Sequence, residues 1–376
     1  MLSLYIHIPY CVRKCLYCGF YSTQYNSEQA DAFIISLACE AAVRQAELSH
    51  RVFRSVYIGG GTPTVLGCEQ AAKILDIIRE HFHVSQDAEF TLEANPNTVT
   101  EKILDTWRQG GVNRLSLGVQ SFSDEVLRTL GRLHTADQAE DAFRLARKAG
   151  FRNIGIDLIY GIPGQVMPQW EATLDRTTRC KPEHISAYSL SLDEGSKFSM
   201  DADAGRLALP DDDIVADMYD RAVTTLGSAG YGRYEISNFS LPDFECRHNM
   251  NYWERGEYLG LGPGAWSFLS GTRSRTIADT AEYTRRLISG ESAVIETESP
   301  GPEQASRETI LLSFRTMNGM DLRRYRRDFG PGVSERLEGA MAPLIAAGLL
   351  RIKEGRATLT DRGIMLSNEA LSRLFS

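Results

Sequence analysis

Six short apolar segments alternate with helical patterns through the first part of the chain, and this alternation limits the possible folds more than any other feature. Each segment has the length of a buried strand, and an amphipathic helical pattern follows it. Such repetition predicts βαβ units with right-handed crossovers and a parallel α/β sheet that either stays open or curls into a barrel. The segments are Leu4–Pro9, Arg54–Gly59, Ala88–Glu93, Asn113–Val119, Asn153–Ile159 and His184–Leu190.

Polar and glycine residues collect where these predicted strands end. Because the carboxyl ends of parallel strands share one edge, and α/β enzymes bind their ligands there, we predict one rim and one site. The strand ends that supply it are Cys11–Cys18, Gly59–Thr62, Glu93–Asn95, Gln120–Ser121 and Gly161–Gln165.

Three cysteines follow the first strand in a C-x-x-x-C-x-x-C array, Cys11, Cys15 and Cys18. Thiolates grouped so closely suit iron–sulfur ligation, and three ligands on a four-iron cubane leave one iron open to a small molecule. A structural zinc site is the weaker alternative, because it needs four ligands. A disulfide is weaker still, since the cysteine count of 7 is odd and nothing marks the chain as secreted.

The second strand end carries the run Gly59-Gly60-Gly61-Thr62-Pro63. It lacks the Lys-Ser/Thr of a phosphate loop and the spacing of a dinucleotide-binding fingerprint, so a tight turn is the simplest interpretation. Three glycines also remove every side chain where a ligand could approach the backbone. Beside the cysteine array, we favour a ligand site and expect the amides and carbonyls of this turn to be free for an amino-acid-like group.

The composition changes beyond Gly230. Residues 231–299 are rich in aromatic residues and glycine without a clear period, which indicates a cap or an irregular extension, and SPGPE at 299–303 is a candidate linker. Three helical patterns and two short strands follow, in an order that resembles a winged-helix module. We therefore predict a core at 1–230, an extension at 231–299 and a mainly helical, winged-helix-like domain at 300–376.

The net charge of −8 argues against nucleic-acid binding, because phosphate contacts require a basic face. We interpret the arginine-rich segment at 323–327 as solvated surface, with an anionic partner as the minor alternative. The N-terminal run lacks the features of a signal peptide, and the apolar runs are too short to span a bilayer. We expect a cytoplasmic protein, with peripheral attachment to the membrane left open.

Further motifs extend over nearly the whole chain: YIHIPYC, GGGTPT, LSLGVQSF, DLIYGIPGQ, YEISNF and HNMNYW. With the cysteine array they resemble the radical S-adenosylmethionine (SAM) superfamily, and within it the oxygen-independent coproporphyrinogen III oxidase-like family. The resemblance implies a partial (β/α)6 barrel and a [4Fe-4S] cluster held by the three cysteines. It also implies that SAM chelates the open iron through its amino and carboxylate groups.

Carried over residue by residue, the resemblance implies a set of SAM contacts. Tyr5 would contact SAM near the cluster, and Gly60, Gly61 and Thr62 would receive its amino group and backbone. Arg132 is suited to the SAM carboxylate, because a guanidinium group pairs with a carboxylate in a bidentate manner. The other polar contacts implied are Glu93, Gln120 and Asp157.

Two departures separate this chain from the oxidases of that family. The oxidases carry a further cysteine two positions after the third ligand, where this chain has Phe20. They also have an N-terminal extension before the cluster strand, which begins here after three residues. Both features instead resemble the haem chaperones of the same family.

The segment HNMNYW also resembles those chaperones, in which the region is associated with haem binding. The resemblance implies His248 as an axial ligand, with Tyr252 and Trp253 offering flat apolar faces to the porphyrin. Cys246 is a rival ligand. Without the resemblance, a buried histidine and two core aromatic residues would be the preferred interpretation.

We therefore expect a haem chaperone of porphyrin metabolism that binds haem, a [4Fe-4S] cluster and SAM. It would deliver haem to acceptor proteins, respiratory or membrane-bound, and a second copy of the chain is a further candidate partner. The alternative is an enzyme, either an oxygen-independent coproporphyrinogen III oxidase or a radical SAM methyltransferase. DNA binding by the C-terminal part is a third and weaker alternative. Whether the chain is an enzyme stays open on the sequence.

Overall fold

Six parallel strands form the centre of the structure, a computed structural model that describes residues 1–375. Side chains on both faces of these strands are buried, which is typical of parallel strands that are covered on both sides. The predicted parallel α/β sheet is confirmed. Its strands, adjacent in this order, are β1 (Leu2–Ile8), β4 (Val52–Gly60), β5 (His83–Ala94), β6 (Arg114–Gln120), β7 (Ile154–Tyr160) and β8 (His184–Ser189).

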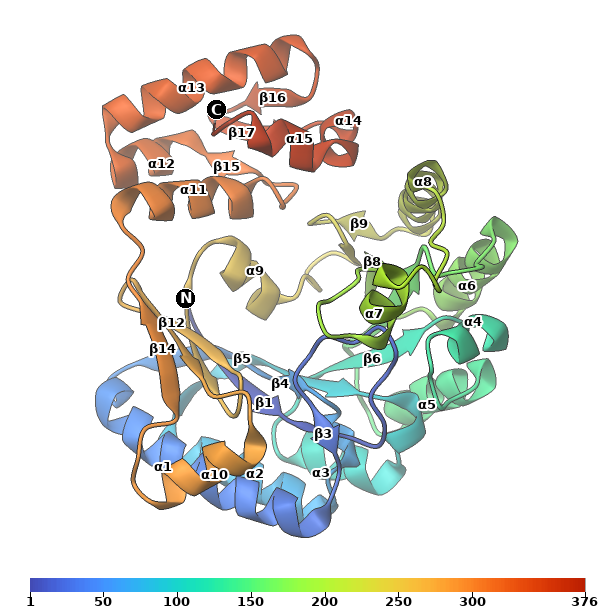
Figure 1. Cartoon of the computed structure of the whole chain (residues 1–376), viewed down its shortest axis with the longest axis vertical. Coiled ribbons are helices and arrows are strands. Elements are labelled where there is room, and N and C mark those ends of the chain that lie inside the picture. Colours follow the sequence, from blue (N-terminus) through green and yellow to red (C-terminus); the bar gives the residue numbers. More distant parts are fainter. Residues whose placement is uncertain (376) are drawn as a thin grey trace.

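Helices in the connections cover the outer face of this sheet. Figure 1 shows α1, α2 and α3 below the sheet, and α5 and α6 around its other end. Side-chain caps precede several of them, such as Asn26 before α1 and Thr135 before α5. The helices are α1 (Ser27–Leu48), α2 (Cys68–His81), α3 (Glu101–Gln109), α4 (Asp124–Thr129), α5 (Ala136–Lys148), α6 (Met167–Cys180), α7 (Lys197–Asp203) and α8 (Asp212–Ser228).

The sheet does not close into a barrel, because it is extended at both edges to 12 strands. On one edge β11 pairs in parallel with β1, and an antiparallel series continues from it. On the other edge, β10 and β9 pair antiparallel after β8. The added strands are β9 (Gly232–Arg233), β10 (Asn238–Ser240), β11 (Glu257–Leu261), β12 (Trp266–Leu269), β13 (Thr272–Thr276) and β14 (Val294–Glu298).

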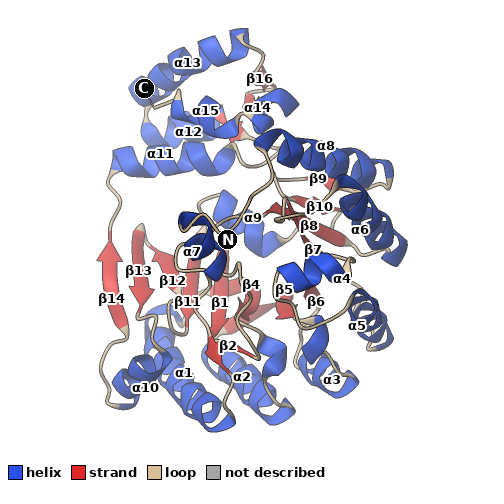
Figure 2. Cartoon of the chain, turned by 45° about the vertical axis from the view of Figure 1, so that its right-hand side comes forward, coloured by secondary structure: helices blue, strands red, loops and turns tan. Residues whose placement is uncertain are grey.

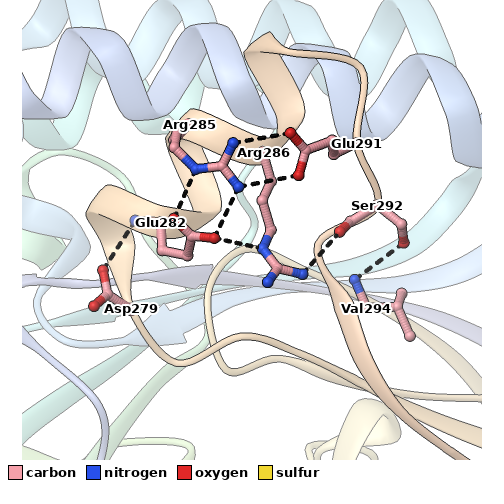
Figure 3. A network of polar contacts seen from close by, with 7 residues as sticks. All are labelled: Asp279, Glu282, Arg285, Arg286, Glu291, Ser292 and Val294. Atoms are coloured by element: carbon pink, nitrogen blue, oxygen red, sulfur yellow. Dashed lines mark hydrogen bonds and ion pairs between the residues drawn. The ribbon is translucent and has the colours of Figure 1, made fainter.

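Residues 231–299 are therefore not the irregular extension that the sequence indicated. Their strands are two to five residues long, which is too short for an alternating pattern to be visible in the sequence. A charged network fixes the turn between the helix α10 (Thr280–Ile288) and β14 (Figure 3). Glu282 pairs with Arg285 at 2.8 Å and with Arg286 at 2.7 Å, and Arg285 also pairs with Glu291 at 2.9 Å.

The C-terminal residues form a separate layer over the inner side of the sheet, as Figures 1 and 2 show. Three helices are followed by a hairpin, to which β15 adds a third strand. This order agrees with the winged-helix-like prediction, while the boundaries of the three predicted parts stay predictions. The elements are α11 (Pro302–Ser313), β15 (Met320–Asp321), α12 (Leu322–Phe329), α13 (Pro331–Ala346), β16 (Leu350–Lys353), β17 (Arg356–Leu359), α14 (Asp361–Met365) and α15 (Ser367–Ser372).

The arginines of α12 are exposed, and most of them pair with nearby acids. Arg324 and Arg327 lie 3.6 and 2.9 Å from the carboxylate of Asp328, and Arg326 lies 3.4 Å from Glu335. Exposed pairs of this kind contribute little to stability, and their presence agrees with a solvated surface. In the described part of the chain, no helix combines the length and the apolar character needed to cross a membrane.

Candidate functional site

The three cysteines lie in a loop that is closed by two short strands. β2 (Tyr10–Cys11) and β3 (Thr23–Gln24) pair in parallel, and the amide of Thr23 donates to the carbonyl oxygen of Pro9 at 2.7 Å. The three cysteine side chains are half-buried free thiols. All three line one cavity of about 530 Å³, which lies inside the curve of the central sheet. The loop therefore brings the whole array to one place.

Donors from other strand ends reach two of the thiols. The hydroxyl of Thr62 donates to Sγ of Cys11, and Nη1 of Arg132 donates to Sγ of Cys15, both at 3.5 Å. Burial raises the pKa of Cys18 to about 11, so this thiol needs a bound metal to lose its proton at neutral pH.

No three His, Cys, Asp or Glu side chains among residues 1–375 are close enough to share a single metal ion. A four-iron cubane does not require such closeness, because each thiolate binds a different iron atom. The arrangement of the cysteines is therefore compatible with a cluster, and it offers no ready site for zinc.

The glycine turn after β4 packs directly on the strand that carries the first cysteine. A side chain at Gly61 would lie 2.5 Å from the carbonyl oxygen of Tyr10. The amides of Gly61 and Thr62 donate to the carbonyls of Ile8 and Tyr10, and the amide of Gly60 donates to a glutamate of β5. The expectation of free amides is wrong, because the turn uses all three to bind its neighbouring strands. Close backbone packing explains the need for glycine at position 61.

Two half-buried carboxylates lie on the cavity wall, on β5 and β7. Glu93 accepts a hydrogen bond from the hydroxyl of Tyr57 at 2.7 Å, and burial raises its pKa to about 7. Asp157 accepts from the hydroxyls of Ser116 at 2.9 Å and Ser186 at 2.7 Å, and burial raises its pKa as well. A cationic group entering the cavity would favour the ionised form of both acids.

The end of β6 and the following loop bring an amide and a guanidinium group to the same wall. Gln120 has a φ of 67°, at an irregularity in the pairing of β6 with β7, and it lines the cavity. Nη2 of Arg132 donates to the carbonyl oxygen of Gly118 at 2.6 Å. The buried Nε of Arg132 has no hydrogen-bond partner in the described part of the chain. This spare donor suits a carboxylate ligand.

Tyr5 lies behind the cavity wall rather than on it. The Nε2–H of His7 donates to the carbonyl oxygen of Tyr21 at 2.8 Å, so the ring's Nδ1 accepts the hydroxyl of Tyr5 at 3.0 Å. Burial raises the pKa of that hydroxyl. His7, which the sequence marked only as a strand residue, ties the cysteine loop to β1. Within the described structure, the implied SAM contacts that do line the cavity are Gly60, Gly61, Thr62, Glu93, Gln120, Arg132 and Asp157.

The segment HNMNYW forms the helix α9 (Arg247–Trp253), which lies on the inner side of the sheet against β1 and β4 (Figure 1). Glu89 of β5 holds its start by accepting the amides of Arg247 and His248, both at 3.0 Å. His248 is buried, and both ring nitrogens are engaged, Nδ1 with the hydroxyl of Ser55 at 3.0 Å and Nε2 with that of Tyr252 at 2.9 Å. Burial lowers the pKa of His248 to about 3. The imidazole is therefore neutral.

The other implied haem residues do not line the cavity in the described structure. The thiol of Cys246 is fully buried, and burial raises its pKa to about 12. Trp253 is half-buried, and its buried indole N–H has no hydrogen-bond partner among residues 1–375. Asn249 is the residue of α9 that does reach the cavity wall.

Comparison with known proteins decides the family. Residues 5–177 match the model of the radical SAM superfamily, and residues 302–366 match that of the HemN C-terminal domain. The chain is 35% identical to the heme chaperone HemW of Mycobacterium tuberculosis over 99% of this chain and 94% of that protein. It is 38% identical to the heme chaperone HemW of Escherichia coli over 70% of this chain and 69% of that protein. The chain belongs to the HemW family.

The fold of this HemW-family chain is also found in a solved structure. Coproporphyrinogen III oxidase (HemN) from Escherichia coli, a radical SAM enzyme, superposes with a TM-score of 0.87 at 25% identity. The match covers 99% of this chain and 89% of that one. This confirms the predicted radical SAM fold, including the C-terminal part.

Membership of the HemW family, within the radical SAM superfamily, implies a [4Fe-4S] cluster and SAM. The residues present fit both groups. The thiols line one cavity, and an unpartnered guanidinium N–H and two half-buried carboxylates face the same space. Phe20 lines this cavity as well and is 63% exposed.

Sequence reasoning missed several residues that line this cavity, among them Arg114 and His184. These two line it from the first positions of β6 and β8, and each is 1% exposed. The signal available in the sequence was a charged residue at the start of an otherwise apolar buried strand, which is rare unless the charge is paired.

Proposed function

We propose that this chain is a haem chaperone that carries a [4Fe-4S] cluster and SAM, binds haem and delivers it to acceptor proteins, including respiratory proteins at the membrane. The observation that carries the proposal is the identity of 33–38% to heme chaperones HemW over 70–99% of this chain. Phe20 supports it, because the oxidases of the family carry a cysteine at that position.

In this proposal the cavity wall has two tasks. Cys11, Cys15 and Cys18 hold the cluster, which supplies one-electron redox chemistry when it is bound. The spare donor of Arg132 receives the SAM carboxylate, and the half-buried acid Glu93 receives its amino group. The remaining SAM contacts that we propose are Tyr5, Gly60, Gly61, Thr62, Gln120 and Asp157.

For haem we propose contacts from His248, Tyr252 and Trp253. Ligation by His248 would require a local rearrangement. Ligation by His248 must break its hydrogen bond to either Ser55 or Tyr252, because each ring nitrogen already has a partner. His248 remains a better ligand than Cys246. Its imidazole is already neutral and ready to bind iron, whereas the buried thiol must first lose a proton.

The test is a haem titration of the anaerobically reconstituted protein, followed by its Soret absorption. We expect a saturable Soret change for the wild type, and an altered spectrum for His248→Ala. Cys246→Ala and the exposed control His50→Ala should match the wild type. The chaperone proposal fails if the wild type shows no haem-dependent Soret change. Identical spectra for the wild type and His248→Ala would overturn the ligand assignment alone.

Haem delivery needs a separate measurement, because a protein can bind haem without transferring it. We expect the haem-loaded chain to pass its haem to an apo-respiratory protein in membrane vesicles faster than haem-loaded serum albumin does at equal concentration. Equal rates from both donors would contradict a dedicated delivery role.

Oxidase activity is the second candidate, favoured by the structural match to coproporphyrinogen III oxidase. Anaerobic incubation with coproporphyrinogen III, reductant and SAM discriminates between the two functions. We expect no decarboxylated porphyrinogen above the level of a Cys15→Ala control. Appearance of that product would establish an enzyme, and appearance of a methylated product would point to a radical SAM methyltransferase.

A further inference from the structure

Arg114 is a buried charge that the chain itself leaves without a partner. It occupies the first position of β6 and is 1% exposed. Its guanidinium makes no hydrogen bond or ion pair with any other residue of the described chain, and its Nε is completely buried. Burying an unpaired arginine is costly, and native proteins pair such groups with a carboxylate, ordered water or a ligand. The side chain lines the same cavity as the cysteines.

The two acids on either side of Arg114 are committed to other partners. Both oxygens of Glu89 accept backbone amides at the start of α9, from His248 and Arg247. Both oxygens of Asp157 accept serine hydroxyls, from Ser116 and Ser186. Each acid attracts Arg114 through space without forming an ion pair with it. The donors of Arg114 therefore remain available.

His184 supplies a second spare donor beside Arg114. Its Nε2 lies 2.7 Å from the hydroxyl oxygen of Tyr234, and that oxygen also accepts the amide of Cys246 at 3.3 Å. Nε2 is the acceptor that the described chain offers to the phenol hydrogen, so the ring proton lies on Nδ1. Nδ1 is buried and has no partner in the part of the chain that the structure describes.

Both spare donors face the space over Gly155 on β7. A Cβ built at Gly155 would lie 3.3 Å from Nδ1 of His184 and 3.5 Å from Nη2 of Arg114. A methyl group there would already be in close contact with both side chains, so glycine lets the two approach the backbone of β7. Arg114 and His184 both line the cavity that holds the cysteines. We propose that the part of this cavity next to Arg114 and His184, here called the space over Gly155, is an anion site that binds the carboxylate of a small organic acid.

This site is separate from the SAM carboxylate site that we propose at Arg132. Gly155 pairs with Ser116 of β6, whereas Nη2 of Arg132 donates to the carbonyl oxygen of Gly118, two residues or about 7 Å further along that strand. A carboxylate suits the space over Gly155 better than phosphate does, because the acids Glu89 and Asp157 on either side of Arg114 oppose a dianion more strongly than a monoanion.

Formate is the probe that tests the site, because it is the smallest carboxylate. Its binding to the full-length chain is measured by calorimetric titration and by the shift in thermal unfolding, with sodium chloride at equal ionic strength as the reference. We expect saturable formate binding by the wild type. Binding should be at least about tenfold weaker in Arg114→Met, which loses a charge-assisted hydrogen bond. The exposed control Arg336→Met should bind as the wild type does.

A second variant keeps the test decisive if Arg114→Met does not fold. Gly155→Ala fills the space while retaining both donors, and it should also weaken formate binding by at least about tenfold. Formate bound at Arg132 instead would be insensitive to Gly155→Ala. The proposal is overturned if formate has no effect beyond chloride, or if Gly155→Ala binds formate as the wild type does. Tighter binding of inorganic phosphate than of formate would overturn the assignment to a carboxylate.

Discussion

The cysteine loop and helix α9 are equally prominent in the sequence, yet the structure treats the polar groups that border the loop and the imidazole of α9 in opposite ways. On the cavity wall near the cysteines, Nε of Arg132 and Oδ1 of Asn95 are buried without a hydrogen-bond partner in the described chain. In α9, both ring nitrogens of His248 are engaged within the protein. The loop is incomplete without a ligand, whereas the imidazole of α9 is already satisfied.

This difference separates two kinds of binding. A ligand at the cysteine loop gains hydrogen bonds that the protein does not make for itself. A ligand at His248 must displace an internal hydrogen bond, so part of its binding energy is spent on rearranging α9. We expect the first site to be preformed and the second to require a local change, and the following predictions test that contrast.

The largest effect should come from the cysteine loop. We expect Cys15→Ala to reduce the iron content after anaerobic reconstitution from about four atoms per chain to below about one, because a cluster with two remaining ligands is not held. Cys39→Ala, a half-buried cysteine of α1, should keep its iron and its visible absorption. Full iron content in Cys15→Ala, measured colorimetrically, would show that the cysteine loop does not hold the cluster.

The next effect concerns the internal bonds of α9. We expect His248→Ala to lower the free energy of unfolding by about 3 kcal/mol, because it creates a cavity, leaves the hydroxyl of Tyr252 unpaired and removes one of the two partners of the Ser55 hydroxyl. Tyr252→Phe should cost about 1 kcal/mol through the loss of one hydrogen bond. Urea unfolding of the haem-free protein measures both values, with His50→Ala as the exposed control. A stability loss below about 0.5 kcal/mol in His248→Ala would mean that the hydrogen bonds of this residue do not stabilise α9.

A substitution of Arg132 tests whether the ligand site near the cysteine loop is preformed. We expect Arg132→Met to weaken SAM binding by about 30-fold, or about 2 kcal/mol, since a charged hydrogen-bond donor to the carboxylate is lost. The exposed Arg128→Met on α4 should bind SAM normally. Equilibrium dialysis of the reconstituted proteins gives both affinities, and equal values would place the SAM carboxylate elsewhere.

The last effect is a pH dependence that belongs to Glu93. Burial raises its folded-state pKa from 4.5 to about 7, so the native chain holds a proton that the unfolded chain releases between these values. Stability should therefore fall as pH rises from about 4.5 to 7, by no more than about 1.4 kcal/mol per pH unit, and then level off. Glu93→Gln should show a shallower fall in urea unfolding across that range. Parallel pH profiles for the two proteins would show that Glu93 titrates normally.

Much of the fold was accessible from the sequence because it depends on local patterns. The apolar segments at Leu4–Pro9 and Asn153–Ile159 match β1 and β7 to within two residues, since a parallel strand buried on both faces must be continuously apolar. The short strands of residues 231–299 were missed for the converse reason. Strands such as β10 and β12 form because they pair with an existing edge of the sheet. Their own three or four residues are too few to encode a strand.

The sequence by itself determined the cysteine array, the order of the strands and the glycine turn, because each follows from the spacing of neighbouring residues. Only the tertiary structure decided which polar groups are satisfied. In the folded chain, the amides of the glycine turn donate to neighbouring strands, and His248 bonds to both Ser55 and Tyr252. Arg114 and His184 are left facing the space over Gly155. The partners of a hydrogen bond can lie far apart along the chain, so no local pattern records whether a buried donor has found an acceptor.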